Sequence, residues 1–242
     1  MNPIDEKEVM EETAEVETEG VVNDETGDGT TVETGEMEIA PEPDTPLLPP
    51  IAKFEKISFE AFCAIYKPIW IDNMKNIMMQ SGQNPEDDGF AYKEEEFLES
   101  ANSIYDNIKI PRRSTAGSAG YDFVFPYGTT ELGPGNSMLV PTGIKCNMAP
   151  GWVLLEFPRS SLGFKYRIQL DNTVGIIDSD YYNNPSNEGH IMIKVTNDSR
   201  EGYTCVFNTG DKFCQGIFVP FGVTIDDEAN NLRTGGLGST GK

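Results

Sequence analysis

The chain has 242 residues and a formal net charge of −22, which is long enough for one or two domains with a hydrophobic core. Residues 1–50 hold 16 acidic residues against one Lys and so carry −15, which leaves −7 on residues 51–242. No stripe of basic residues is present, and no apolar run approaches transmembrane length, so neither a nucleic acid nor a membrane is expected as a partner. No signal peptide is expected, because the first residues lack a basic start followed by an apolar run, and a cytoplasmic location is expected.

The first 50 residues are rich in Glu, Thr, Val, Gly and Pro and show no apolar period. Such a segment cannot bury enough surface to offset its ordering entropy, so residues 1–50 are predicted to be a disordered acidic tail. Residues 51–57 follow as the first strand of the folded body, with Ala52–Ile57 as its extended part.

Residues 58–108 are predicted to be a helical insertion packed on a β body. Apolar residues recur at helical spacing from Phe59 to Tyr66 and again from Trp70 to Met78, and Pro68 is expected to break the two runs. A third helical stretch is predicted at 92–107. The aromatic and Met residues of this insertion favour packing, and a protein partner that binds the 58–108 segment is the alternative.

From Ile108 onward the pattern predicts an all-β domain over residues 109–231, a jelly roll or β-barrel, because short apolar or alternating runs are separated by Gly, Pro and Asn turns. Residues 232–242 are predicted to form a Gly-rich mobile arm. The predicted strands are Tyr121–Pro126, Ser137–Thr142, Trp152–Phe157, Ile168–Leu170, His190–Thr196, Tyr203–Asn208 and Phe213–Phe218.

The four cysteines show no CxxC spacing and lie among apolar neighbours. Buried free thiols in a reducing compartment are therefore expected. The cysteines are Cys63, Cys146, Cys205 and Cys214.

The stretch from Leu170 to Asn197 has the form of a hairpin. A run that contains Val174, Ile176 and Ile177 leads directly into Asp178. A carboxylate fixed at the end of a buried strand can be tuned into a general base, so Asp178 is the first candidate for catalysis.

Three further motifs carry polar residues beside tight turns, in GSAGYD, PRSSLG and GDKFCQG. Asp122 ends the first motif. Arg159 in the second motif can neutralise phosphate oxygens, and Gln215 in the third can hold a water molecule or a phosphate. Each motif alone is also compatible with an ordinary turn or surface loop.

The C-terminal stretch from Arg233 to Lys242 reads RTGGLGSTGK, and its part from Gly236 onward satisfies the phosphate-loop pattern GxxxxGK. The phosphate-loop interpretation is rejected, because that mechanism needs a preceding strand and a following helix. Glycines do allow backbone N–H groups to converge on phosphates, so an arm that closes over phosphates is one interpretation and a segment without function is the other.

These five stretches, in this order, resemble the five motifs of the trimeric dUTPase family, and GIIDSDY and GGLGSTG carry most of the resemblance. The resemblance covers roughly residues 108–242. It implies a homotrimer of jelly-roll subunits whose three sites combine parts of different subunits. It also implies hydrolysis of dUTP to dUMP and pyrophosphate with Mg²⁺ as the cofactor.

The resemblance further implies roles for individual residues. Asp178 would activate the attacking water, Gln215 would take part in catalysis, and Asp122 would hold the Mg²⁺ through water. The substrate-binding residues that it implies are Arg159, Ser160, Ser161, Asn172, Gly175, Ile177, Tyr181, Arg233, Leu237, Gly238, Ser239 and Thr240.

The sequence departs from the family pattern at several points. Leu237 stands where the family usually has an aromatic ring, Ser161 stands where Gly is common, and the loop at 182–189 is longer than usual. Two rival functions remain. One is a dCTP deaminase-related enzyme, against which Lys194 argues because a cation there cannot act as the catalytic carboxylate. The other is a regulatory protein-binding module on the same fold.

Overall fold

The structure is a computed structural model that describes residues 49–86 and 90–236. The predicted disordered tail, residues 1–50, lies outside the described residues except for its last two positions. The strands are β1 Ala52–Lys56, β2 Arg112–Arg113, β3 Tyr121–Val124, β4 Thr130–Leu132, β5 Ser137–Pro141, β6 Ile144–Met148, β7 Trp152–Pro158, β8 Ile168–Leu170, β9 Gly175–Asp178, β10 Met192–Asn197, β11 Cys205–Phe207 and β12 Lys212–Pro220. The helices are α1 Phe59–Gln80, α2 Glu94–Asn107, α3 Ser160–Tyr166 and the 3₁₀-helix η1 Ser179–Tyr181.

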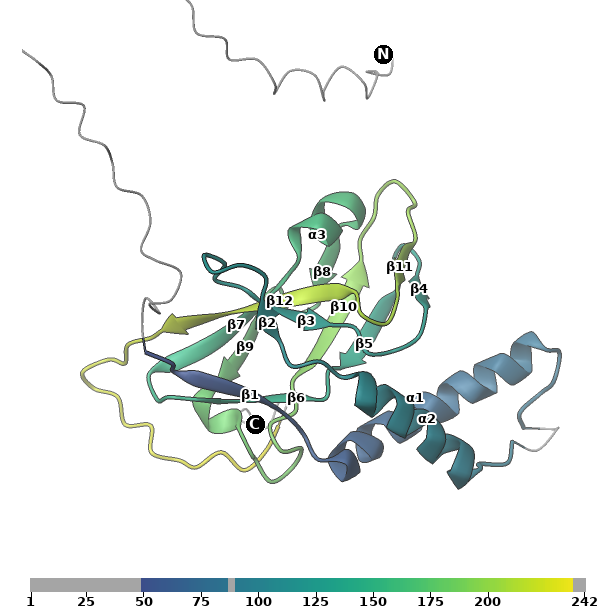
Figure 1. Ribbon diagram of the computed structural model, residues 1–242, viewed down its shortest axis with the longest axis horizontal. Helices are drawn as coiled ribbons and strands as arrows, with labels where there is room; N and C mark the ends of the chain where they lie inside the picture. Colours follow the sequence, from purple (N-terminus) through teal and green to yellow (C-terminus); the bar gives the residue numbers. More distant parts are fainter. Residues whose placement is uncertain (1–48, 87–89, 237–242) are drawn as a thin grey trace, which may run out of the picture. The chain divides into compact units, whose positions relative to one another are not determined.

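All strand pairs of the described body are antiparallel (Figure 1). The largest sheet has the strand order β2-β3-β12-β7-β9, and a second sheet has the order β5-β10-β8. Two further pairs, β1-β6 and β11-β4, complete the body. The predicted fold class is confirmed: a jelly-roll-like antiparallel body that carries helices α1 and α2 between its first two strands.

Each predicted strand overlaps a strand of the structure, but β2, β4 and β6 were not predicted. Strand β2 is two arginines long, and β4 has three residues, so neither is long enough to show an alternating pattern. The PRSSLG motif, which was also compatible with a surface loop, leads into a short helix, α3, that the sequence pattern did not predict.

The hairpin predicted between Leu170 and Asn197 is only partly correct. Strands β8 and β10 do pair, with Leu170 opposite Val195, but β9 between them leaves this pair and joins β7 of the large sheet. The apolar run before Asp178 is also less buried than expected, since Ile176 is 64% exposed in the single chain. Strand β9 lies at the edge of its sheet, with β7 as its one neighbour in the described body.

Pro68 does not break α1, contrary to the sequence prediction, because one helix runs from Phe59 to Gln80 through it. A proline inside a helix removes one backbone hydrogen bond and costs about 3 kcal/mol. Tyr66 and Trp70 are buried on either side of Pro68, and burial of each large side chain contributes about 1.5–3 kcal/mol. This packing offsets the cost, and the helix continues.

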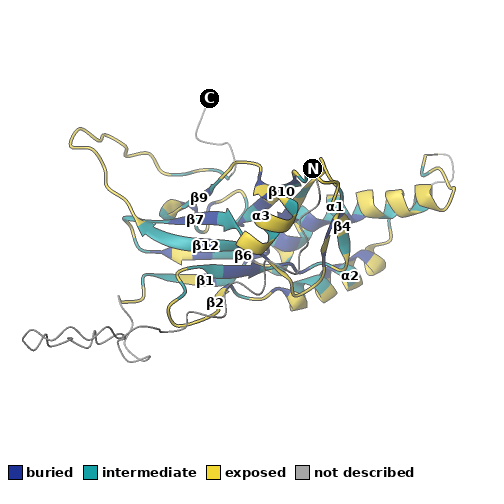
Figure 2. Ribbon diagram, turned by 90° about the horizontal axis from the view of Figure 1, so that it is seen from above, coloured by how far each residue is buried: buried dark blue, intermediate teal, exposed yellow. Residues whose placement is uncertain are grey.

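Aromatic side chains join the helices to the β body. Tyr66 of α1 stacks on Tyr127, with ring centroids 5.9 Å apart, and Trp70 lies edge-on to Phe97 of α2 at 5.8 Å. Figure 2 shows that the second half of α1 is largely exposed, in contrast to the half that carries Phe62 and Tyr66. No helix in the described ranges is both long and apolar enough to span a membrane.

The four cysteines are free thiols, as predicted, and three of them are buried. Burial raises the pKa of the Cys146 thiol to about 12 and that of Cys205 to about 11. These thiols are therefore protonated at neutral pH and pack as small apolar side chains.

A carboxyl group lies inside the apolar body, on β7. Glu156 is 2% exposed, and its Oε1 has no hydrogen-bond partner among the described residues. Gly175 lies opposite it on β9, where a Cβ would approach Glu156 Oε2 to 2.9 Å, so only glycine leaves room for the carboxyl group. Burial raises the pKa of Glu156 to about 8, so the group is neutral at physiological pH.

This pKa makes the free energy of unfolding depend on pH. Because the pKa in the folded state lies above that in the unfolded chain, the stabilisation is complete below about pH 4.5 and is lost as the pH rises towards about 8. We expect Glu156→Gln to match the wild type at pH 5 and to be more stable by about 1–4 kcal/mol at pH 8.5. Urea unfolding at both pH values measures this, and equal pH profiles for the two proteins would contradict it.

Candidate functional site

One group of polar side chains lies around Asp122 on β3. Its Oδ1 lies 3.3 Å from Arg159 Nε, and its Oδ2 lies 2.8 Å from Lys212 Nζ. The Ser114 hydroxyl donates to Oδ2 at 2.7 Å. Three segments far apart in the sequence therefore converge on one carboxylate. We call the residues gathered here the Asp122 group: Ser114, Asp122, Arg159, Lys212 and Gln215.

The charge state of Asp122 results from two opposing effects. Burial favours the neutral acid, but hydrogen bonds from Lys212 and Ser114 together with the charge of Arg159 outweigh burial and lower the pKa. Asp122 is therefore a buried, ionised carboxylate.

Gln215 on β12 lies opposite Asp122 in the strand register. Its Nε2 donates to the Pro158 carbonyl at 3.4 Å. Gly120 of the GSAG turn lies against this side chain, where a Cβ would come within 2.7 Å of Gln215 Oε1. The absence of a side chain at Gly120 therefore leaves room for the amide group of Gln215.

Arg159 is the N-cap residue of α3, and Ser160 and Ser161 open that helix as exposed residues. Antiparallel pairing of β7 with β12 brings Phe157 opposite Gln215, two residues before Arg159. The residues predicted from PRSSLG, GSAGYD and GDKFCQG thus gather at one end of the large sheet.

A second group lies around Asp178 at the end of β9, and we call it the Asp178 group: Asp178, Asp180, Tyr181 and Arg233. Arg233 forms an ion pair with Asp178 and another with Asp180, whose Oδ1 lies 2.8 Å from Arg233 Nε. The guanidinium carbon also lies 5.6 Å from the centroid of the Tyr181 ring. Burial opposes the charge of Arg233, but the two carboxylates outweigh it and raise the pKa of the guanidinium.

Tyr181 is buried and held at its hydroxyl by two contacts. The hydroxyl donates to the His190 carbonyl at 2.9 Å and accepts from Asn187 Nδ2 at 2.8 Å. Burial raises the pKa of Tyr181, so the phenol stays neutral. The carboxylate of Asp178, in contrast, is 51% exposed.

The residues predicted to contact the base lie along the strand that leads to this group. Asn172 is exposed in the turn before β9, Gly175 is buried, and Ile177 is half-buried. Leu237, Gly238, Ser239 and Thr240 lie outside the described residues, so the predicted contacts of these four positions stay predictions.

The structure does not bring the two groups together within one chain. Asp178 lies opposite Val153 near the start of β7, whereas Arg159 follows the last residue of that strand. Six residues of extended strand at 3.3 Å each separate the two positions by about 20 Å. A substrate that needs both groups must therefore take one from each of two chains.

Sequence reasoning missed some residues of these groups. Lys212 and Ser114 both contact Asp122, but neither was singled out, although Lys212 belongs to the same short motif as Gln215. Asn187 donates a hydrogen bond to the Tyr181 hydroxyl. It belongs to the loop at 182–189, of which the sequence analysis noted only the length. These contacts depend on the fold and leave no pattern of spacing.

Within the described ranges, no three His, Cys, Asp or Glu side chains cluster as a metal site would require. Asp122 is the one carboxylate of the Asp122 group. Mg²⁺ is commonly held by one or two carboxylates together with substrate phosphates and water. The donor set fits Mg²⁺ in that form, bound mainly by the substrate, and does not fit a metal enclosed by protein ligands alone.

Comparison with known proteins adds independent findings. A protein-family model described as dUTPase matches residues 106–241. The deoxyuridine 5'-triphosphate nucleotidohydrolase of Lactococcus lactis subsp. lactis (strain IL1403) is 46% identical over 136 residues, which is 55% of this chain and 89% of the relative. The enzyme of the same name from Escherichia coli (strain K12 / DH10B) is 38% identical over 140 residues, with 55% and 87% covered.

One solved structure is also similar in sequence over part of this chain. The crystal structure of dUTPase from Streptococcus mutans is 44% identical, covers 49% of this chain and 90% of that chain, and has a TM-score of 0.43. The family match covers more than half of this chain, and the bacterial relatives align over most of their length. The chain belongs to the dUTPase family and is a dUTP diphosphatase by that membership.

Proposed function

We propose that this protein hydrolyses dUTP by an in-line attack of water on the α-phosphorus, in a site that combines the Asp178 group of one chain with the Asp122 group of another. The separation of the two groups by about 20 Å along β7 is the observation that carries this proposal. A homotrimer closed by three such contacts would supply three equivalent sites.

In this mechanism Asp178 accepts the proton of the attacking water. The water oxygen forms a bond to the α-phosphorus, and the bond from that phosphorus to the oxygen bridging to the β-phosphorus breaks. The products are dUMP and pyrophosphate. General base catalysis of this kind contributes about 10²–10⁴-fold to the rate.

Arg159, Ser160, Ser161 and Gln215 would bind the phosphates or position the water, since guanidinium and hydroxyl donors match phosphate oxygens. Mg²⁺, held through water by Asp122, would neutralise charge on the phosphate chain. The ion pairs of Asp122 with Arg159 and Lys212 support this assignment, because they fix the carboxylate in its ionised form.

Tyr181 would lie against the deoxyribose and exclude a 2′-hydroxyl, and Asn172, Gly175 and Ile177 would line the uracil pocket. The burial of Tyr181 and its two hydroxyl contacts support a fixed ring. A rigid, buried wall discriminates well because the wrong substrate cannot be accommodated by small movements.

Arg233 forms an ion pair with Asp178 in the present structure, and a more highly charged anion could compete for it. Substrate phosphates would draw the guanidinium away and leave Asp178 free to act as the base. Leu237, Gly238, Ser239 and Thr240 would follow Arg233 over the substrate as an arm. A cytoplasmic location and a protein partner on residues 58–108 remain predictions.

The deaminase alternative has less support. Lys194 forms an ion pair with Asp171, 2.7 Å from Nζ to Oδ2, and has no role as a proton acceptor there. Assays with dUTP, dCTP, dTTP and UTP in parallel distinguish the alternatives. Pyrophosphate release from dUTP alone supports the proposal, and formation of deoxyuridine nucleotides from dCTP contradicts it.

We expect Asp178→Asn to lower turnover of dUTP by about 10²–10⁴-fold and to retain binding of a non-hydrolysable dUTP analogue, because the amide keeps the shape but cannot accept the proton. Pyrophosphate release and calorimetry measure the two effects. Asp198→Asn, at an exposed carboxylate paired with Arg167, is the matched control. Near-normal turnover of Asp178→Asn would remove the base assignment.

Mixed assemblies test the shared site. Asp178→Asn and Gln215→Ala chains, each of which we expect to be nearly inactive alone, are unfolded together in equal amounts and refolded. Random assembly would give about a quarter of the sites a normal Asp178 group from one chain and a normal Asp122 group from another. We therefore expect about a quarter of wild-type activity, whereas a site built within one chain predicts none.

Deletion of residues 232–242 removes Arg233 and the arm that follows it. We expect turnover to fall by about 10²–10³-fold, because the arm supplies charge to the phosphates in the transition state, with little change in the affinity for dUMP. Deletion of residues 1–50 is the control and should leave turnover unchanged. Unaltered kinetics in the first deletion would show that the arm is not part of the site.

A further inference from the structure

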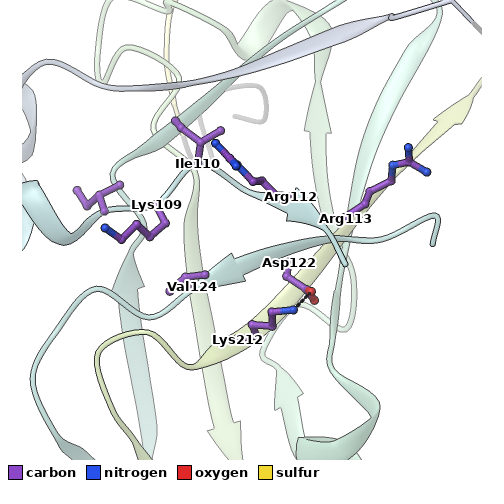
Figure 3. Close-up of a pocket in the computed structure, with 8 residues that line it drawn as sticks. Lys109, Ile110, Arg112, Arg113, Asp122, Val124 and Lys212 are labelled. Atoms are coloured by element: carbon purple, nitrogen blue, oxygen red, sulfur yellow. Dashed lines mark ion pairs between the residues drawn. The ribbon is translucent and has the colours of Figure 1, made fainter. Parts of the chain in front are cut away.

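The proposed site leaves the sugar of the nucleotide to one side chain, the ring of Tyr181. The charged residues around Asp122, at which Lys212 is directed in Figure 3, face phosphate groups that dUTP and UTP share. The two nucleotides differ only at the 2′ position of the sugar. Discrimination against UTP therefore depends on how firmly the Tyr181 ring is held in place.

The loop that follows Tyr181, residues 182–189, holds the phenol through Asn187. While Asn187 Nδ2 donates to the Tyr181 hydroxyl at 2.8 Å, its Oδ1 accepts from Asn184 Nδ2 at 2.7 Å and from the Gly189 N–H at 3.1 Å. Asn184 Nδ2 also donates to the Tyr181 carbonyl at 2.9 Å. Both ends of the Asn187 amide have partners, so the position of the phenol follows the position of the loop.

The backbone of this loop is strained. Asn183 and Glu188 have φ angles of 55° and 59°, in the left-handed region, which Asn adopts readily but Glu does not. Gly189 has a φ of 78°, and a Cβ there would lie 2.5 Å from the Tyr181 carbonyl oxygen. A residue such as Glu188 keeps this conformation only where its surroundings impose it. The loop therefore depends on contacts from outside itself.

Those outside contacts meet at the Glu188 carboxylate. It accepts from the backbone N–H of Ser58 at 3.0 Å and from the Ser58 hydroxyl at 2.5 Å. Lys145 of β6 pairs with it at 3.1 Å and also donates to Asn183 Oδ1 at 2.8 Å. Ser58 is the N-cap of α1, and its hydroxyl oxygen accepts from the Ala61 N–H. The first turn of the helical segment, residues 58–108, is thus joined to the loop.

A simpler explanation is that Glu188 only attaches α1 to the β body, since carboxylates are favourable near the N-terminus of a helix. The helical segment already has other attachments, such as the hydrogen bond of 2.7 Å from the Tyr105 hydroxyl to the Ile57 carbonyl. Attachment alone accounts neither for the strained backbone at Glu188 nor for its place directly after Asn187.

We propose that Glu188 is a positioning residue for the exclusion of ribonucleotides, through which the helical segment fixes the Tyr181 ring. Ser58 holds the Glu188 carboxylate, the backbone transmits this position to Asn187, and Asn187 holds the Tyr181 hydroxyl. The inference rests on the proposed hydrolysis of dUTP and on the proposed role of Tyr181. A ring that is free to move admits a 2′-hydroxyl, so loss of this connection favours ribonucleotides.

The first test compares binding of dUMP and UMP by calorimetry in the variant Glu188→Asn. Asn adopts a positive φ readily, but its neutral amide is one methylene shorter and does not reach Ser58. We expect the preference for dUMP over UMP to fall about tenfold, mainly through tighter binding of UMP. The ratio of kcat/KM for dUTP to that for UTP should fall equally, with kcat for dUTP changed by less than about twofold.

Two further variants test the path. Glu188→Gln should keep most of the preference, because its amide oxygen can still accept from Ser58. Asn187→Ala should lower the preference about tenfold, and addition of Glu188→Asn should lower it no further, because both residues act on the same hydroxyl. Losses that add in the double variant would overturn the proposed path. Unfolding curves confirm that each variant is folded.

The control variant is Glu96→Asn, the same chemical change at an exposed residue of α2 that pairs with Lys93 at 2.6 Å. We expect its preference for dUMP to be unchanged. An equal fall in this variant and in Glu188→Asn would overturn the proposal, as would a normal preference in Glu188→Asn. Failure of the wild type to hydrolyse dUTP would instead contradict the proposed function, and the binding of dUMP and UMP still decides the role of Glu188.

Discussion

The rigidity of strand β7 governs the placement of the chemistry in this protein. The strand is hydrogen-bonded on both sides, to β12 and to β9, so its two ends cannot approach each other. Its start faces Asp178, and its end leads into Arg159. Because an extended strand fixes this separation at about 20 Å, the candidate base and the phosphate-binding residues lie too far apart for one substrate. Association of chains thereby becomes a requirement of the proposed chemistry.

Two carboxyl groups on the same sheet show how strongly the surroundings decide charge. Asp122 faces Gln215 of β12, and Glu156 faces the next residue, Gly216. Three donors hold Asp122 ionised, whereas Glu156 has no cation beside it among the described residues and keeps its proton up to about pH 8. Two adjacent residues of β12, Gln215 and Gly216, therefore lie opposite an ionised carboxylate and a neutral carboxylic acid. The ionised group is held by two cations at the site, and the neutral one is buried within the sheet.

The helices connect to the site region through the loop that follows η1. Glu188 of this loop accepts a hydrogen bond from the backbone N–H of Ser58, the N-cap of α1, at 3.0 Å and pairs with Lys145 at 3.1 Å. Asn187, its neighbour, donates to the Tyr181 hydroxyl. Two adjacent residues thus connect this loop both to the helical segment and to a buried ring. The order of this loop gives Tyr181 a single position.

The sequence by itself determined the family and the fold class, because the order of short motifs and the alternation of strands are local patterns. It also indicated Asp122, Arg159, Asp178 and Gln215 as residues of interest. Only the tertiary structure decided which of them meet, since the contacts of Lys212 with Asp122 and the pairing of β9 with β7 join segments distant along the chain. The continuous helix through Pro68 has the same origin, because packing against other elements outweighs a local preference. Local patterns can be recognised in a sequence alone, but a strand register and the balance of charges around a residue arise only when separate segments are brought into contact.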